Sequence, residues 1–259
     1  MKIAITGKGG VGKTTLAAFL SYLYAHEGKR VIAVDADPDA NLATAFGISR
    51  EESAKIVPIA EMADLIEERT GAKPGRIGGM FKLNPKVDDI PEKVGVRIDG
   101  IRLLIMGKSK AGASGCYCPE NVLLKRLLRH LVLERDEVII ADMEAGIEHL
   151  TRGTAEGVDA FIVVVEPGLR SIQTAATVKE LAKDLGIKKL FVVANKVRNE
   201  DDIKFIKDNL PDITFLGYIS FDPKIMEADM KGIPSYEIAL KSLEEASEIK
   251  KRLEEGMTQ

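Results

Sequence analysis

Short apolar runs rich in valine and isoleucine recur along the whole chain, and stretches with a helical spacing of apolar residues separate them. The runs are apolar at consecutive positions, which is typical of parallel strands that helices cover on both faces. Strands are expected at residues 2–6, 30–35, 101–106, 137–142, 159–166, 189–195 and 214–220. The clearest helical stretches are 13–27, 120–133, 170–185 and 235–255. This alternation predicts a three-layer α/β fold, in which helices cover both faces of a doubly wound, mostly parallel sheet.

Residues 71–100 interrupt the alternation, because they are rich in glycine, proline and charge. We interpret this segment as a flap or insertion within the domain and not as a linker between domains. No internal repeat or low-complexity tract is present. The 259 residues are therefore expected to form a single domain, since one α/β domain of this size is common.

The overall charge narrows the classes of partner. The net charge is −3 and the isoelectric point is about 5.8, which argues against a protein that coats nucleic acid or an anionic membrane. No apolar run approaches the roughly 20 residues that a membrane-spanning helix needs. The first residues, "MKIAITGKGG", contain no cleavable signal pattern. A cytoplasmic location with reduced thiols is therefore expected.

A phosphate-binding motif follows the first expected strand. Residues 7–15, "GKGGVGKTT", fit the pattern G-x-x-x-x-G-K-[ST] between a strand and a helix, and we call them the P-loop. Glycines let the backbone wrap around a phosphate, and the helix amino terminus adds partial positive charge. Lys13 is expected to reach the β- and γ-phosphates, and Thr14 to place its hydroxyl on Mg²⁺. The residues expected to bind ATP or ADP here are Gly9, Gly10, Val11, Gly12, Lys13, Thr14 and Thr15.

A second lysine, Lys8, stands inside the P-loop. The stretch "KGGVGKT" resembles the deviant Walker A loop of the group that contains MinD, ParA, the nitrogenase iron protein and the arsenite-pump ATPase. That resemblance implies a P-loop ATPase that forms a homodimer when nucleotide binds. It further implies that Lys8 crosses the dimer interface, contacts the phosphates bound by the partner subunit and takes part in catalysis with Lys13.

Carboxylates follow two further strands, in "VDADPDANL" and "IIADMEAG". The carboxyl ends of parallel strands are where such sheets bind ligands, and a carboxylate there could align water or bind Mg²⁺ through water. By the same resemblance, Asp35 and Asp37 belong to the first switch, and Asp37 orients the attacking water. Asp142 corresponds to the Walker B aspartate, and Gly146 offers its N–H to the γ-phosphate. The alternative for the first pair is two solvated turn aspartates.

A later strand ends in "VVANKV", which places Asn195 and Lys196 at the same edge of the sheet. In the group named above, an asparagine at this point hydrogen-bonds the adenine, and residues 219–223 would close over the base. Asn195 and Lys196 are therefore expected to contact the nucleotide. The alternative is that Asn195 is a polar loop residue without that role.

The only two cysteines, Cys116 and Cys118, stand one residue apart in "GASGCYCPEN". They make a poor disulfide, since closing so small a ring is strained. Two copies of the pair across a two-fold axis supply four thiolates, which suit tetrahedral Zn²⁺ or square-planar Ni²⁺. Glycines before the pair and Pro119 after it predict a loop or helix start, where the thiolates are exposed. The alternatives are two ordinary apolar cysteines, or oxidative cross-linking of a dimer.

Three stretches narrow the resemblance. "DPDANL", "GCYCPE" and above all "DMEAGIEHLTRGT" resemble the CooC-type ATPases, which mature nickel-containing carbon monoxide dehydrogenase. The resemblance implies an ATP-hydrolysing metallochaperone, slow without its partner, that passes Ni²⁺ to a carbon monoxide dehydrogenase apoprotein. Zn²⁺ on the same cysteines remains an alternative cargo.

Two other functions compete with this one. Four cysteinates across a dimer also suit a [4Fe–4S] cluster, so an iron–sulfur carrier or electron donor is possible. A positioning ATPase that works on membrane or DNA is the third. Residues 240–259 alternate glutamate with lysine and offer no basic, bulky-apolar face, so the positioning ATPase ranks last and no nucleic-acid or membrane partner is expected.

Overall fold

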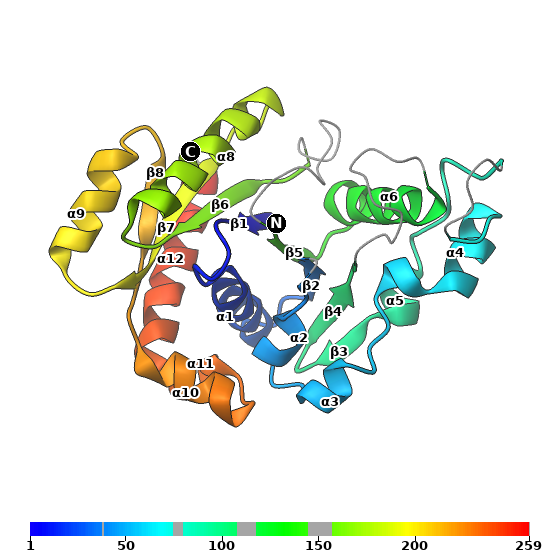
Figure 1. The fold of residues 1–259 in the computed structure, drawn as a ribbon, viewed down its shortest axis with the longest axis horizontal. Coiled ribbons are helices and arrows are strands. Elements are labelled where there is room, and N and C mark those ends of the chain that lie inside the picture. Colours follow the sequence, from blue (N-terminus) through cyan, green and yellow to red (C-terminus); the bar gives the residue numbers. More distant parts are fainter. Residues whose placement is uncertain (38, 75–79, 108–117, 145–156, 259) are drawn as a thin grey trace.

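The structure, a computed structural model, describes residues 1–37, 39–74, 80–107, 118–144 and 157–258 (Figure 1). Within these ranges eight strands form one sheet, in the order β3-β4-β2-β5-β1-β6-β7-β8. β3 pairs antiparallel with β4, and every other neighbouring pair is parallel. The prediction of a doubly wound, mostly parallel sheet is therefore confirmed.

The strands are β1 (Lys2–Thr6), β2 (Val31–Ala36), β3 (Val96–Ile98), β4 (Ile101–Ile105), β5 (Val138–Met143), β6 (Ala160–Val165), β7 (Leu190–Val197) and β8 (Thr214–Ser220). The helices before β5 are α1 (Lys13–His26), α2 (Leu42–Ala45), α3 (Arg50–Ser53), the 3₁₀ helix η1 (Ile59–Glu61), α4 (Ala63–Thr70), α5 (Ile90–Val94) and α6 (Pro119–Glu134). The later helices are α8 (Leu169–Asp184), α9 (Glu200–Asn209), α10 (Pro223–Lys231), α11 (Ser235–Ile238) and α12 (Leu240–Thr258).

Successive residues of the central strands face opposite helical layers. In β1, Ile3 and Ile5 belong to the core that α1, α2, α11 and α12 form on one face of the sheet. Ala4 belongs to the core on the other face, where η1, α4, α5, α6 and α8 pack. A third cluster lies under α8 and α9. In Figure 1, α1 and α12 lie on one face of the sheet, and α6, α8 and α9 lie on the other. Burial on both sides explains why the strands are apolar at consecutive positions.

The expected helix 235–255 is wrong in one respect, because it is divided in two at Ala239. This residue has a non-helical backbone, with φ −90° and ψ 59°, between α11 and α12. The break lets α11 turn Tyr236 onto Tyr22 of α1, with ring centroids 4.3 Å apart, while α12 packs along β8. Tertiary packing thus overrides a local pattern that favours one continuous helix.

The segment 71–100, expected to be a flap or insertion within the domain, contains regular structure in its second half. Residues 90–98 form α5 and the edge strand β3, which pairs antiparallel with β4. Arg69 of α4 binds the Asp89 carboxylate with two hydrogen bonds of 2.9 and 2.7 Å and so ties this part to the domain. Residues 75–79, in the first half of the segment, lie outside the described residues.

Among the described helices, none combines the length and the apolar composition that a bilayer span requires.

The core predicts a simple stability test. Phe161 of β6 is 0 % exposed, so Phe161→Ala is expected to lower the free energy of unfolding by about 3–5 kcal/mol through lost apolar burial and a residual cavity. Phe221→Ala, at a side chain that is 48 % exposed, serves as the matched control and should cost less than about 1 kcal/mol. Urea denaturation of both variants measures the difference, and equal losses would contradict the assigned core.

Candidate functional site

The P-loop leaves the centre of the sheet after β1 and leads directly into α1. Strand order reverses at β1, whose neighbours are β5 and β6, and such a reversal is where open α/β sheets bind ligands. Within the loop, the Val11 N–H donates to Lys8 O over 3.3 Å. The first helical bond of α1 runs from Leu16 N to Gly12 O over 3.1 Å. The amino terminus of α1 therefore adjoins the loop, as phosphate binding requires.

Two positions of the P-loop require glycine, because neighbouring strands lie too close to the loop backbone for a side chain. A Cβ at Gly7 would collide with the carbonyl oxygen of Val164 in β6. A Cβ at Gly12, where φ is +97°, would collide with the side-chain amide of Asn195 in β7. The loop is therefore packed against β6 at its start and against β7 at its end. Of the other expected nucleotide residues, Gly9 and Gly10 are exposed, Val11 and Lys13 are buried, and Thr14 and Thr15 are half-buried.

Thr14 and Asp142 meet at the carboxyl end of β5. The Thr14 hydroxyl donates to Asp142 Oδ2 over 2.6 Å, and the Asp142 side chain is almost fully buried. Burial raises the pKa of Asp142 to about 6, although the Thr14 hydrogen bond and nearby Lys13 oppose that shift. Asp142 Oδ1 is buried and has no hydrogen-bond partner among the described residues. A threonine hydroxyl beside a carboxylate oxygen with spare capacity is a donor set that fits Mg²⁺.

Asp35 lies directly opposite Asp142 in the pairing of β2 with β5. Its side chain is fully buried, and its two oxygens accept the N–H groups of Leu42, over 2.9 Å, and of Asp37, over 3.3 Å. Burial raises the pKa of Asp35 to about 7, against the lowering effect of the Leu42 hydrogen bond. Asp35 thus fixes the start of α2 and the turn that carries Asp37. Its expected contact with nucleotide stays a prediction.

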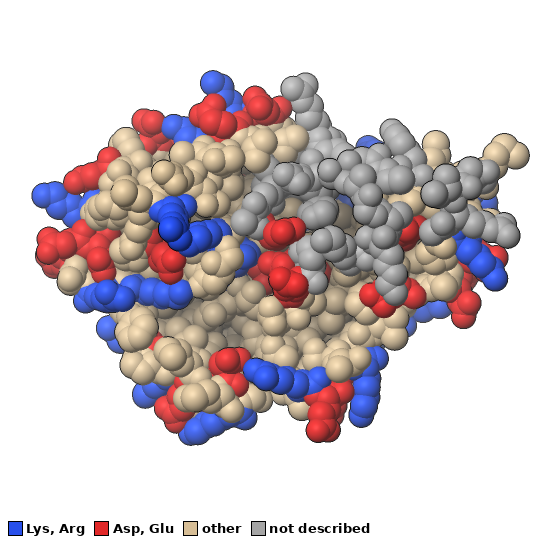
Figure 2. Space-filling view, viewed as in Figure 1, with Lys and Arg blue, Asp and Glu red and all other residues tan. Residues whose placement is uncertain are grey.

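Asp37 contacts the P-loop lysine. The Asp37 carboxylate lies 3.6 Å from Lys13 Nζ, and these side chains are 20 % and 7 % exposed. The Lys8 side chain, in contrast, makes no hydrogen bond or ion pair with the described part of the chain, and the residue is half-buried. Figure 2 shows carboxylates gathered at the centre of this face, beside residues that are not described. Gly146, the expected γ-phosphate contact, lies outside the described residues.

Asn195 and Lys196 contact the P-loop itself. Asn195 is buried, and its amide donates to Val11 O over 2.7 Å. Lys196 Nζ donates to Gly10 O over 2.7 Å and lies 3.1 Å from the Glu166 carboxylate. Their contact with adenine stays a prediction, because the structure gives both side chains protein partners. The sequence analysis missed Glu166, although a glutamate directly after the apolar run "AFIVVV" was a visible signal.

Cys118 is the residue before the first turn of α6. The prediction of a helix start is confirmed for Cys118, but the expected exposure is wrong, since its side chain is only 5 % exposed. The reason is that the first turn of α6 is packed into the protein, so that Pro119 and Glu120 are buried as well. Cys116 lies outside the described residues. The part of the chain that the structure describes contains no cluster of three or more metal-binding side chains.

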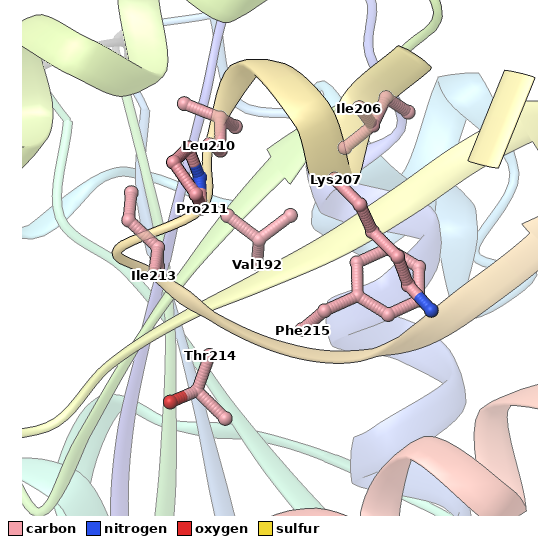
Figure 3. Close-up of a pocket in the computed structure, with 8 residues that line it drawn as sticks. All are labelled: Val192, Ile206, Lys207, Leu210, Pro211, Ile213, Thr214 and Phe215. Atoms are coloured by element: carbon pink, nitrogen blue, oxygen red, sulfur yellow. The ribbon is translucent and has the colours of Figure 1, made fainter. Parts of the chain in front are cut away.

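Two cavities lie at the amino ends of strands, at the opposite edge of the sheet from the P-loop. One, of about 320 Å³, is formed where α9 ends and β8 begins (Figure 3). Its lining is mostly apolar, with Ile206, Leu210 and Phe215 among the contributing side chains and Lys207 Nζ 4.7 Å from the Phe215 ring centre. The other, of about 250 Å³, lies at the starts of β2 and β4. No P-loop residue lines either cavity.

Comparison with known proteins agrees with this geometry. Residues 2–235 match the model of the CobQ/CobB/MinD/ParA nucleotide-binding domain. The chain is 50 % identical, over 92 % of its length and 90 % of the relative's, to the carbon monoxide dehydrogenase accessory protein CooC of Rhodospirillum rubrum. It is 52 % identical, over 90 % of both chains, to an uncharacterised ATP-binding protein of Methanocaldococcus jannaschii.

Solved structures agree on the fold. MinD of Aquifex aeolicus, in its complex with MinC, superposes with a TM-score of 0.67 at 24 % identity, covering 97 % of this chain and 94 % of that one. A putative plasmid partition protein of Borrelia burgdorferi, bound to AMPPNP, gives 0.70 at 16 % identity over 98 % of both chains. Similarity at these identities bears on the fold alone. The family match, the 50 % identity to CooC over 92 % of the chain and the P-loop geometry agree. The chain belongs to the CobQ/CobB/MinD/ParA family of nucleotide-binding ATPases and, within it, is similar to CooC.

Proposed function

We propose that this ATPase is a metallochaperone that loads Ni²⁺, or alternatively Zn²⁺, for the maturation of carbon monoxide dehydrogenase. The observation that carries the proposal is the similarity to CooC over 92 % of a chain whose only two cysteines form a Cys-x-Cys pair. The P-loop and the carboxylates around it supply the ATPase part of the proposal. The cysteine pair supplies the cargo site.

In the proposed hydrolysis, each of the site residues and the backbone N–H groups has a distinct role. Lys13 binds the β- and γ-phosphates, and the P-loop N–H groups surround them. Thr14 and Asp142 would hold Mg²⁺, which would neutralise phosphate charge during hydrolysis. Asp37 orients the attacking water and accepts a proton from it. Gly146 donates its N–H to the γ-phosphate.

The Lys13–Asp37 ion pair gives nucleotide binding a consequence. The Lys13 ammonium lies 3.6 Å from the Asp37 carboxylate, and an incoming phosphate, which carries more negative charge, competes with that carboxylate for it. An incoming γ-phosphate therefore displaces Asp37, whose carboxylate becomes available to water. The Lys8 ammonium has no hydrogen-bond or ion-pair partner in the described part of its own subunit, which supports the proposed contact with the partner subunit's nucleotide.

The metal site is formed between subunits. Cys116 and Cys118 from two copies of the chain give four thiolates, whereas one copy gives only two, so metal affinity depends on dimerisation. The burial of Cys118 adds a condition, since its thiol reaches a partner subunit only if the first turn of α6 moves outward. Nucleotide-driven dimer closure is the proposed cause of that movement, and hydrolysis reverses it to release the metal to the apoprotein.

The base of the nucleotide is expected beside β7. One hydrogen of the Asn195 amide is used by Val11 O, which leaves its second hydrogen for an adenine nitrogen. Residues 219–223 include the end of β8 and the first residue of α10, and the Phe221 N–H donates to Val197 O over 2.8 Å, which keeps this segment against the end of β7. This contact supports the proposal that the segment closes over the base.

Asp37→Asn tests the proposed water-orienting role. The rate of single-turnover ATP hydrolysis is expected to fall about 100-fold, since the variant loses the proton acceptor. ATP affinity is expected to stay equal or to rise, because Lys13 loses its competing carboxylate. The matched control is Asp39→Asn, an exposed carboxylate two residues away, which should retain the wild-type rate. A wild-type rate in Asp37→Asn would contradict the role.

Asp35→Asn tests the buried carboxylate through pH. The raised pKa of Asp35 means that the native state of the nucleotide-free protein binds more protons than the unfolded chain between about pH 4 and pH 7. The free energy of unfolding therefore falls as pH rises through this window. Asparagine cannot ionise, so the fall between pH 5 and pH 8 should be smaller in the variant by roughly 2 kcal/mol. Urea denaturation at both pH values measures this change in the free energy of unfolding. Asp39→Asn is the control and should show the wild-type change with pH. A wild-type change in Asp35→Asn would contradict the raised pKa of Asp35.

Metal titration of the reduced protein tests the cargo site. Oligomeric state and bound metal are measured together, with ADP and with a non-hydrolysable ATP analogue, for the wild type and for Cys116→Ala/Cys118→Ala. One Ni²⁺ or Zn²⁺ per dimer is expected, changed by nucleotide and lost in the double variant, while ATP binding is retained. Bound iron with a brown colour after anaerobic purification would instead support an iron–sulfur carrier. The absence of cysteine-dependent metal in every nucleotide state would contradict both.

A further inference from the structure

The end of β7 departs from regular strand geometry beside the P-loop. The register of β7 against β8 shifts between Ala194 and Val197, which marks a bulge or irregularity at the two residues between them. One of these, Lys196, has a φ of +57°, a left-handed conformation that costs a lysine roughly 1–2 kcal/mol. Bulges re-aim side chains and are frequent beside active sites. The irregularity here turns both Asn195 and Lys196 onto the P-loop.

The contacts of these residues go to loop carbonyl groups. Asn195 Nδ2 donates to Val11 O over 2.7 Å, and Lys196 Nζ donates to Gly10 O over 2.7 Å. The Lys196 N–H in turn donates to Asn195 Oδ1 over 2.9 Å, which fixes the direction in which the amide points. Two consecutive carbonyl groups of the P-loop are thus directed away from the phosphate position and toward β7.

The directions of the Gly10 and Val11 carbonyl groups also determine where the next N–H groups point. In a planar trans peptide the carbonyl and the following N–H point in opposite directions. With Val11 O turned toward Asn195, the Gly12 N–H points to the inside of the loop. With Gly10 O turned toward Lys196, the Val11 N–H points away from Lys196, and it donates to Lys8 O over 3.3 Å, a bond that a phosphate oxygen has to replace. These N–H groups are the donors that a P-loop offers to phosphate.

Glu166 extends the arrangement to a third strand. Its carboxylate lies 3.1 Å from Lys196 Nζ, and it follows the last residue of β6 directly. The Glu166 backbone N–H donates to the buried hydroxyl of Ser171 in the first turn of α8, over 3.1 Å, so its position is fixed as well. Glu166 therefore keeps the Lys196 ammonium above the loop against competition from water.

We propose that Glu166, Asn195 and Lys196 form a loop clamp that orients the N–H groups of the P-loop for phosphate before nucleotide arrives. In the clamp these are positioning residues, since they act on the phosphates through the backbone of Gly10 and Val11. The inference rests on ATP binding at the P-loop and is independent of the proposed metal cargo.

The clamp predicts a loss of affinity without a loss of chemistry. Lys196→Met keeps the length of the side chain and removes its ammonium, and it is expected to weaken both ATP and ADP binding about 3- to 10-fold. KM for ATP should rise by a similar factor with kcat nearly unchanged, because the lost binding is shared by ground state and transition state. Glu166→Gln should give a smaller change in the same direction, and Lys196→Arg should restore most of the affinity.

Lys179→Met is the matched control. Lys179 is exposed to a similar degree, 38 % against 43 % for Lys196, and pairs with Asp212 over 2.8 Å at a distance from the P-loop. Nucleotide titration and hydrogen exchange of the peptide covering residues 7–15 are measured for the nucleotide-free form of each variant. The clamp requires faster exchange of that peptide in Lys196→Met and wild-type exchange in Lys179→Met.

Two results would overturn the proposal. One is a Lys196→Met variant that matches Lys179→Met in both nucleotide affinity and exchange. The other is an equal loss in Lys196→Met and Lys196→Arg, because the clamp depends on a cation that reaches Gly10 O. Failure of the proposed metal function would leave these outcomes unaffected, since the wild-type nucleotide titration contains no nickel or zinc.

Discussion

The absence of space beside Gly12 is the constraint on which the nucleotide site depends. A side chain there would displace the Asn195 amide, and with it the hydrogen bond to Val11 O. The same contact fixes the end of the P-loop at the point where α1 begins. On the other side of the loop, Thr14 is bound to the buried Asp142 carboxylate. The phosphate site is therefore determined from both flanks by β5 and β7, and the glycine spacing of the loop is a packing requirement as well as a conformational one.

Most of the fold could be predicted because its signals are local. Apolar runs buried on both faces marked all the parallel strands, and the P-loop spacing marked the joint between β1 and α1. The edge strand β3 was missed, although Asp99 and Gly100 before β4 form the Asp-Gly turn that favours a two-residue hairpin, with φ of +41° and +83°. The break at Ala239 carries no such signal, because it is set by where Tyr236 packs. Local pattern cannot report a contact that another helix supplies.

In the candidate site, too, features with a local sequence signal could be predicted and features set by tertiary contacts could not. The positions of Lys13, Thr14 and Asp142 followed from motif and strand end, since the sheet brings the carboxyl ends of its strands together. The partners of Asn195 and the burial of Cys118 did not follow. Both depend on side-chain direction, which a β-bulge in one case and the packing of the first turn of α6 in the other determine. Sequence thus indicated which residues gather at this edge, and the structure supplied which atoms they contact.

The hydrogen bonds of the P-loop also bear on how the chain folds. Thr14 and Asp142 are 128 residues apart in sequence, Val11 and Asn195 are 184 apart, and Gly10 and Lys196 are 186 apart. Contacts of such separation form late, since the entropy of closing long loops is lost before they contribute. A nascent chain that ends before β7 has the complete phosphate motif but lacks the partners of its carbonyl groups. The phosphate motif therefore acquires its binding geometry only after the chain as far as Lys196 has been made.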